Sequence, residues 1–415
     1  MSVAPRTAGI LAAIGLLTAL TSPAVGGFAT LVLAGAVAAD ALAVRRRPEV
    51  RRSLRSHLAR GVATPLRIDA ELPGIGSVRL RQPAPAALTI EPREAVARLE
   101  ATVTPRRRGR HTLQPVALRN EGPLGLGRWR HEGGGAQEVT VYPDVPAARR
   151  LALAVRQGRF RAAGRLTRGP LGLGTEFESI RDYEPDDDVR QVNWRATERM
   201  QRPMSNQYRV EQDREVMLLI DAGRLMASPL GERTRLDVAV DAAVAVALVA
   251  DVLGDRAGTL AFDRQVRRQL APRRAGGHAV VRTLLDLEPR AEESDYELAF
   301  RSVEGAKRSL MLIFCDLLEE TAARPLVDAV PVLSRRHAVT VASVRDPELD
   351  SVLATPPDDD HALGAQAVAL DVLGARTRVA HMLRRAGAQV VEAPADSLSA
   401  ACVGAYLRAK TRGRA

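Results

Sequence analysis

The sequence predicts an α/β protein with three parts: an N-terminal transmembrane helical hairpin, a small β-rich domain and a doubly wound α/β domain. Three patterns predict this class. Two apolar stretches stand back to back at the N-terminus, short alternating runs broken by Pro and Gly follow, and apolar runs then alternate with segments of helical spacing. The expected boundaries are residues 1–47 for the hairpin, 48–150 for the β-rich domain, 151–214 for a linker with a charged segment, and 215–415 for the α/β domain.

The hairpin is predicted from two apolar stretches, Ala8 to Leu20 and Phe28 to Val44, the second interrupted by Asp40 near its end. A membrane helix needs roughly 17 to 25 residues, which the second stretch reaches when its flanks are counted. Arg6 precedes the first stretch and a cluster beginning at Arg45 follows the second, so the positive-inside rule places both ends in the cytoplasm. We expect a multi-pass protein of the bacterial cell membrane with its body in the cytoplasm; the alternative is a cleaved signal peptide.

The charge composition indicates which classes of partner the part of the chain after the hairpin is expected to bind. The chain has 60 basic and 49 acidic residues and a formal net charge of +11, and all the basic residues except Lys307 and Lys410 are arginine. These arginines are dispersed and do not form one patch, so no nucleic-acid partner is expected. The two cysteines, Cys315 and Cys402, lie in apolar patterns and are interpreted as buried, reduced thiols, which fits a cytosolic compartment.

The β-rich domain is predicted from short alternating runs between residues 66 and 142, each bounded by Pro or Gly. We expect a small sandwich or barrel. The hexapeptide Gly-Pro-Leu-Gly-Leu-Gly occurs twice, at residues 122–127 and 169–174. Because the flanks of the two copies do not repeat, we interpret them as the same kind of turn and not as a duplicated domain. A basic, partly helical connection is expected at residues 151–166.

The α/β domain is predicted from the alternation of strand and helix patterns after residue 214. Strands are expected at residues 215–221, 258–262, 265–270, 309–316, 338–344 and 389–392. Helices are expected at residues 234–253, 278–287 and 296–303, in a segment ending near 335, and at 367–386 and 397–410. This order implies a mostly parallel sheet with helices on both faces.

Two of the expected strands end in an acid, Asp221 and Asp316. Ligands of open parallel sheets bind beyond the carboxyl ends of the strands. Because hard cations prefer oxygen ligands, the two carboxylates are candidates for a Mg²⁺ site. The alternative is that both acids cap loops or helix termini.

The segment from 174 to 213 is the least generic part of the chain. Its carboxylates come first and its arginines follow, and because burying an unpaired charge costs several kcal/mol, these groups face water, each other or a partner. The segment resembles the signature of the bacterial family called domain of unknown function 58, with Asp186 where the family usually has Gly. The matching residues are Glu176, Phe177, Arg181, Tyr183, Pro185, Asp187, Asp188, Arg190, Trp194 and Arg195.

The resemblance implies that the α/β domain is similar to a von Willebrand factor A domain. That fold binds a metal through Asp-x-Ser-x-Ser after its first strand, a Thr from another loop and a later Asp. Here Gly223 and Leu225 replace the two serines, the Thr position falls near Ser294 or Asp295, and Asp316 matches the later acid. The implied site is degenerate, so we expect no cofactor, with Mg²⁺ at the two acids as the open alternative.

The resemblance also implies association with a MoxR-type AAA+ ATPase in chaperone-like assembly or maturation of other proteins. We expect a membrane-anchored cytosolic scaffold or adaptor, in which the signature with Tyr183 and Trp194 either locks domains together or presents a docking face. Catalysis is not expected, because the chain contains no Gly-x-x-x-x-Gly-Lys-Ser/Thr, Gly-x-Ser-x-Gly or His-Glu-x-x-His motif. The alternative is a metal-dependent adhesion module or a cell-envelope-associated protein-binding module. Neither the client protein nor the oligomeric state follows from the sequence.

Overall fold

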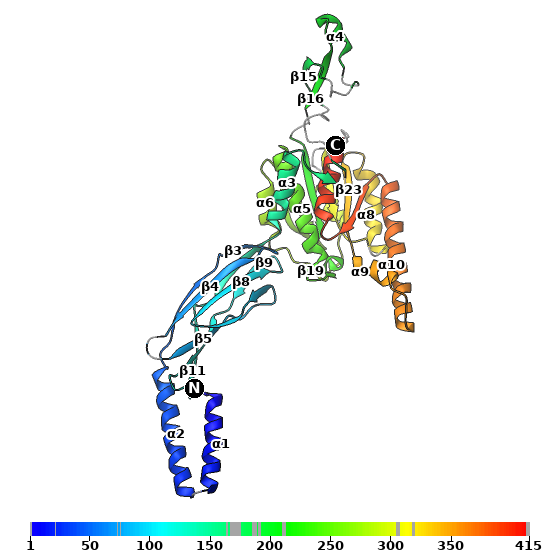
Figure 1. Ribbon diagram of the computed structural model, residues 1–415. Coiled ribbons are helices and arrows are strands. Elements are labelled where there is room, and N and C mark those ends of the chain that lie inside the picture. The colour runs from blue at the N-terminus through cyan, green and yellow to red at the C-terminus, as the bar shows by residue number, and fades with distance from the viewer. Residues whose placement is uncertain are drawn as a thin grey trace. The chain divides into compact units, whose positions relative to one another are not determined.

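The computed structural model describes residues 2–20, 22–72, 74, 76–162, 165–166, 176–184, 189, 192–209, 213–303, 308–317 and 320–411. The chain divides into two compact units, Met1–Tyr142 and Pro143–Ala415. The first contains two apolar helices and a β-rich region, and the second contains an α/β region (Figure 1). The mixed α/β class predicted from the sequence is therefore confirmed.

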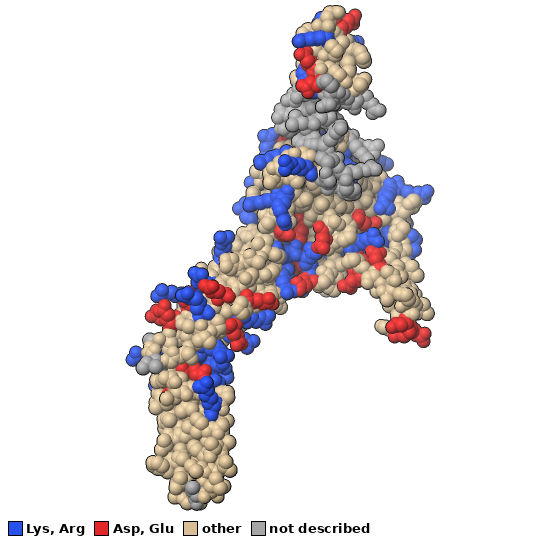
Figure 2. Space-filling model, in the orientation of Figure 1, with Lys and Arg blue, Asp and Glu red and all other residues tan. Residues whose placement is uncertain are grey.

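A pair of apolar helices begins the first unit. Helix α1 spans Pro5–Leu20, helix α2 spans Pro23–Ala43, and the two pack against each other. In the described part of the chain, α2 is the helix that is long and apolar enough to cross a membrane, with a mean hydropathy of 1.8, whereas α1 has 16 residues. Residues 7–39 contain no Lys, Arg, Asp or Glu, and the visible face of the pair is correspondingly uncharged in Figure 2. The composition of α2 indicates association with a membrane.

The helix pair is tied to the β-rich region at the first Gly-Pro-Leu-Gly-Leu-Gly turn. Asp40, near the end of α2, is 2% exposed; its Oδ1 accepts a hydrogen bond from Leu124 N at 2.9 Å. Its Oδ2 accepts from Leu126 N at 2.8 Å and from Gly127 N at 2.9 Å. A Cβ on Gly127 would lie 2.5 Å from the backbone nitrogen of Ala41, so this close approach requires glycine. The copy at residues 122–127 is a turn, as predicted, and it also binds a buried carboxylate.

The β-rich region arranges its strands in three sheets around one core. Its inward-facing residues alternate with exposed ones, as in strand β4, where Leu66, Ile68 and Ala70 are buried and Arg67 is exposed. The first sheet has the order β1 (Ser2–Val3), β11 (Gly127–Gly133), β10 (Val116–Glu121), β5 (Ser77–Arg81), β7 (Glu94–Val96). The second has the order β2 (Glu49–Ser53), β4 (Thr64–Glu71), β8 (Arg98–Pro105), β6 (Leu88–Glu91). The third has the order β3 (His57–Ala59), β12 (Gln137–Tyr142), β9 (Gly109–Leu113).

A six-stranded sheet forms the centre of the second unit (Figure 1). Its order is β21 (Val266–Arg273), β20 (Arg256–Phe262), β17 (Glu215–Asp221), β22 (Ser309–Phe314), β23 (Ala338–Arg345), β24 (Gln389–Pro394). All neighbouring pairs are parallel except β20 and β21, so β21 is an antiparallel edge strand. The strand order reverses between β17 and β22, which brings the carboxyl ends of these two strands together at a topological switch point.

Helices cover both faces of this sheet. On one face, α7 (Tyr296–Arg301), α8 (Glu320–Leu333) and α10 (Asp360–Arg385) contribute to a core that includes Leu219 and Ile313. On the other, α5 (Arg235–Val252) and α11 (Leu398–Thr411) pack against each other and the strands, and α3 (Val145–Arg156) packs against α5. The unit also contains α6 (Gly277–Leu284) and α9 (Pro347–Ala354).

Shorter elements complete the second unit. Strand β15 (Glu176–Asp182) pairs antiparallel with β16 (Met204–Arg209), and α4 (Trp194–Met200) lies in the connection between them. Two further short pairs are β13 (Arg161–Ala162) with β14 (Arg165–Leu166), and β18 (Pro229–Leu230) with β19 (Arg233–Thr234). A 3₁₀ turn, η2, spans Arg224–Ala227.

Two helix starts in the second unit differ from the sequence prediction. Helix α9 was not predicted, and α10 begins at Asp360 where a start at residue 367 was expected. Both are capped by an acid: Asp346 accepts a hydrogen bond from Glu348 N, and Asp359 accepts one from Ala362 N. No element was predicted at residues 345–366, although Asp is among the residues preferred at an N-cap and Pro at the first helical position.

Candidate functional site

Asp221 is the last residue of β17 and lies at the carboxyl edge of the sheet, 4% exposed. Its Oδ1 accepts hydrogen bonds from Ser294 Oγ at 2.5 Å and from the Gly223 backbone nitrogen at 2.8 Å. Its Oδ2 accepts a hydrogen bond from Tyr296 Oη at 2.7 Å. Both carboxylate oxygens are thus bound by donors of the same chain.

The environment of Asp221 shifts the pKa of its carboxyl group. Burial raises the pKa of this carboxyl above its usual value, and the hydrogen bonds from Ser294, Gly223 and Tyr296 oppose that rise. Burial likewise raises the pKa of the Tyr296 phenol, which stays protonated and donates. Of the two residues expected near the Thr position, Ser294 reaches Asp221, whereas Asp295 caps α7 by accepting a hydrogen bond from Leu298 N at 2.9 Å.

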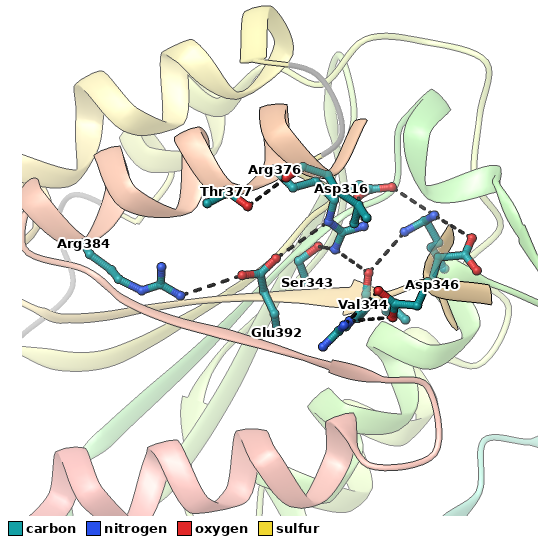
Figure 3. Close-up of polar contacts among 12 residues, drawn as sticks. Asp316, Ser343, Val344, Asp346, Arg376, Thr377, Arg384 and Glu392 are labelled. Carbon is teal, nitrogen blue, oxygen red and sulfur yellow. Dashed lines mark hydrogen bonds and ion pairs between the residues drawn. The ribbon is translucent and has the colours of Figure 1, made fainter. Parts of the chain in front are cut away.

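Asp316, two residues beyond β22, lies between two buried guanidinium groups. Arg235 Nε is 3.0 Å from Asp316 Oδ2, and Arg376 Nη1 is 3.9 Å from Oδ1. The three side chains are between 1% and 4% exposed. Figure 3 shows Arg376 beside Asp316 at the ends of the strands. Burial raises the pKa of Asp316, and the charges of Arg235 and Arg376 oppose this by favouring the carboxylate.

The two arginines meet at one backbone carbonyl (Figure 3). Arg376 Nη2 donates to Val344 O at 2.7 Å, and Arg235 Nη1 donates to the same oxygen at 3.2 Å. Arg376 Nε also lies 3.7 Å from Glu392 Oε1, and Arg235 Nη2 lies 3.3 Å from Asp346 Oδ2. Three acids therefore balance two buried cations, and the network joins α5, α10, β23 and β24.

This arrangement does not fit a hard divalent cation. Two guanidinium groups already present positive charge to Asp316, and a metal ion beside them would be repelled. The oxygens of Asp221 are engaged by three donors, and Gly223 and Leu225 supply no side-chain oxygen. Within the described ranges, no group of three or more Asp, Glu, His or Cys side chains is placed to hold a metal ion.

The charged segment forms a distinct substructure, the signature hairpin, which comprises β15, α4 and β16. The strands pair from Glu176 opposite Arg209 to Asp182 opposite Met204. Among the family-signature residues, Glu176, Phe177 and Arg181 lie on β15, Tyr183 follows it, and Trp194 and Arg195 begin α4. Pro185, Asp187, Asp188 and Arg190 lie outside the described residues, as does the second copy of the hexapeptide.

Polar contacts hold α4 to strand β16 of the signature hairpin. Asn193 caps the helix by accepting a hydrogen bond from Ala196 N at 3.0 Å, and its Nδ2 donates to Asn206 Oδ1 at 2.8 Å. Thr197 Oγ1 accepts a hydrogen bond from Met204 N at 3.0 Å. The cap and these cross-links fix the orientation of α4, and with it the side chains that α4 presents.

Several large apolar side chains of the signature hairpin face solvent. Trp194 is 70% exposed, Val189 is 66% exposed and Met200 is 49% exposed. Arg195 and Arg199, on the same helix as Trp194, are also exposed. An exposed tryptophan beside arginines is the composition that dominates the energetics of protein interfaces.

Four residues of these sites were not predicted from the sequence. Arg235 had a local signal, because Thr234 and Asp237 form a capping box that places Arg235 in the first turn of α5, near the strand ends. Arg376 and Tyr296 had none, since their partners are distant in the sequence. Asp40 was noted as an interruption of an apolar stretch, although an acid in such a stretch is usually paired and buried.

The fold and the site define a mixed α/β protein with two buried acids at its sheet edge and an exposed, charged hairpin. Residues 179–360, which include most of the signature hairpin and both acids, match the sequence model of a family described as Protein of unknown function DUF58. The chain therefore contains a region of this family. The resemblance carried by the signature residues is confirmed.

The relatives are mycobacterial. One uncharacterized protein of Mycobacterium bovis and two of Mycobacterium tuberculosis strains are each 28% identical to this chain over 217 residues. The matched segment covers 49% of this chain and 66% of each relative, so the chain spans just under two thirds of their length.

Comparison with solved structures gives only low TM-scores. A cohesin module from a Clostridium perfringens family 33 glycoside hydrolase has a TM-score of 0.18 at 11% identity, covering 23% of this chain and 96% of the module. An uncharacterized membrane-spanning protein from Vibrio fischeri has a TM-score of 0.15 at 15% identity, covering 48% of this chain and 98% of that protein. Scores of this size carry no argument about the fold or the function of this chain.

Proposed function

We propose that this protein is a membrane-anchored cytosolic scaffold or adaptor that binds a MoxR-type AAA+ ATPase through the signature hairpin. The partner class comes from the family resemblance. The observation that carries the proposal is Trp194, which is 70% exposed on a helix whose orientation is fixed by the Asn193 cap. Holding a large aromatic side chain in water is unfavourable unless a partner covers it, and burying it at an interface contributes several kcal/mol.

The α/β unit is proposed to resemble a von Willebrand factor A domain that works without a metal. What supports this is the strand order, a central parallel sheet with one antiparallel edge strand, β21. The internal neutralisation of Asp316 by Arg235 and Arg376 supports the metal-free state. In this proposal the sheet is a rigid support for the signature hairpin and not a ligand site.

The proposed membrane arrangement is a hairpin in which both helices cross the bilayer and the body faces the cytoplasm. Its support is the apolar length of α2, the uncharged stretch from residue 7 to residue 39, and the arginines at both ends, Arg6 and the cluster from Arg45. Helix α1 alone, with 16 residues, is short for a crossing. Protease treatment of intact cells tests the arrangement: the body should be protected, and cleavage of the body from outside would contradict it.

The docking proposal is tested by measuring binding of the full chain, in detergent, to a MoxR-type AAA+ ATPase from the same bacterium, with ATP and with ADP. We expect nucleotide-dependent binding that Trp194→Ala weakens at least tenfold. Leu370→Ala is the matched control, because Leu370 is 61% exposed on α10, outside the signature hairpin. Absence of binding, or equal loss in both variants, would contradict the proposal.

A further inference from the structure

Two hollows lie side by side near the amino-terminal ends of β22, β23 and β24, at the edge of the sheet opposite Asp221 and Asp316. One, of about 420 Å³, is lined by the residues just before β22, by the loop from α8 into β23, and by Gln389 at the start of β24. The other, of about 450 Å³, lies between α7 and α8. Arg336 and His337 line both. We call the two together the α8 groove, and each hollow has the size of a ligand site, about 300–1,000 Å³.

The first hollow is basic. Arg308, Arg335 and Arg336 line it, and no Asp or Glu is among its described lining residues. The three arginines are exposed. Three guanidinium groups around one hollow attract an anionic group, and each can bind a carboxylate through two parallel hydrogen bonds.

Two smaller groups add hydrogen-bonding capacity to the basic hollow. Ser334 Oγ is shielded from solvent and has no hydrogen-bond partner among the residues that the structure describes. His337 Nδ1 accepts a hydrogen bond from Ser309 N at 3.3 Å, which places the ring proton on Nε2 and leaves that atom a donor. Burial lowers the pKa of His337, which favours the neutral ring.

The second hollow is mainly apolar. Its apolar lining residues are Phe300, Val303, Pro325, Ala329, Val332 and Leu333. Two acids also line it, and each pairs with an arginine: Glu297 with Arg301 at 3.7 Å and Asp328 with Arg324 at 3.5 Å. Val332 is 65% exposed, and exposed apolar side chains that line a hollow are typical of a surface that a partner covers. Both hollows are open to solvent, which suits an extended peptide better than an acyl chain, since an acyl chain requires an enclosed apolar cavity.

We propose that the α8 groove binds a peptide segment of another protein in which two apolar side chains stand next to a carboxylate. The apolar side chains enter the hollow between α7 and α8, and the carboxylate binds Arg308, Arg335 and Arg336. This site is separate from the signature hairpin and does not depend on the ATPase proposal. It gives a scaffold a second binding surface, which selects its client by charge and hydrophobicity.

The test uses the full chain, immobilised in detergent, and a pool of random octapeptides whose bound members are sequenced. We expect at least tenfold enrichment of peptides that carry two apolar residues within three positions of an acid. The combined change Arg335→Glu and Arg336→Glu should abolish the enrichment, and Val332→Ser should weaken the apolar preference while keeping the acidic one. All three positions are exposed, so the fold should tolerate these changes, which a thermal melt checks.

Arg264→Glu is the matched control, because Arg264 is an exposed arginine between β20 and β21 and does not line the groove. It should leave the enrichment unchanged. No enrichment with the unaltered chain, or enrichment that survives the double charge reversal, would overturn the proposal. Binding of dodecanoate or inorganic phosphate in place of peptides would overturn it as well, and would point to a lipid or a free anion.

Discussion

The carboxyl edge of the six-stranded sheet and the signature hairpin differ in the burial of their candidate functional side chains. At the sheet edge, Asp221 and Asp316 are buried and each is bound by groups of its own chain. On the signature hairpin, Trp194 and its neighbouring arginines face water. The sheet edge has the position of a ligand site, but donors of the chain engage both oxygens of Asp221, and two guanidinium groups balance the charge of Asp316. The hairpin does not lie at such a position, but it exposes a large aromatic side chain to solvent.

This difference shows that position in a fold does not by itself assign function. In parallel sheets, the switch point is where ligands usually bind, because loops from neighbouring strands converge there. In this chain, Arg235 and Arg376 contact Asp316 at the switch point. These contacts join two helices that are distant in the sequence. Whether a site can bind a ligand therefore depends on which of its side chains still lack hydrogen-bond or charge partners, as well as on its location in the fold.

The largest expected effect comes from opening the sheet-edge network. Arg376→Met removes one of the two cations beside Asp316 and leaves its carboxylate undercompensated, so the free energy of unfolding should fall by about 3–5 kcal/mol. Chemical denaturation measures this. Arg378→Met is the control on the same helix, since Arg378 is 58% exposed and pairs with Glu320, and its loss should cost less than about 1 kcal/mol. Equal effects of the two changes would show that the network does not stabilise the fold.

A smaller effect is expected from removing the charge of Asp221. Its pKa is raised from a reference value of 3.8, so the folded chain holds this proton more tightly than the unfolded chain, and stability falls as the pH rises above about 4. Asp221→Asn keeps hydrogen-bonding groups for Ser294 and Tyr296 but removes the buried charge. The melting temperature of the variant should exceed that of the unaltered chain by roughly 2–4 °C at pH 7.5, the shift expected for about 1 kcal/mol.

The same variant gives a pH signature. The difference between the two melting temperatures should shrink as the pH falls, because the raised pKa of Asp221 means that the folded chain takes up this proton before the unfolded chain does. A difference that stays constant from pH 4 to pH 8, or that is largest at acid pH, would show that Asp221 is not held as a buried carboxylate.

The smallest expected effect is that of Mg²⁺. If Arg235 and Arg376 occupy the electrostatic position of a cation, 5 mM Mg²⁺ should change the melting temperature by less than about 1 °C relative to EDTA. A resident ion at saturating concentration would instead stabilise the fold by about 2–3 kcal/mol. A rise of several degrees that disappears in Asp221→Asn would favour the Mg²⁺ site that the sequence leaves open as an alternative.

The sequence predicts the fold more completely than it predicts the candidate site. The apolar runs ending in Asp221 and near Asp316 placed two adjacent strands, because buried parallel strands are continuous apolar runs with little ambiguity. The identity of the groups facing those acids could not be predicted, since Arg376 reaches Asp316 from a helix far along the chain. Asp40 gives the same lesson, because its partners are backbone N–H groups of a turn that the sequence marks only as a turn.

The most direct test of the account is hydrogen–deuterium exchange on the complex of the full chain with the MoxR-type ATPase. We predict that amides of residues 192–209, in α4 and β16, are protected on binding, and that amides of residues 221–227 and 290–296, around Asp221, are unchanged. Protection confined to the Asp221 loops, with residues 192–209 unaffected, would contradict the account and return the binding site to the carboxyl edge of the sheet.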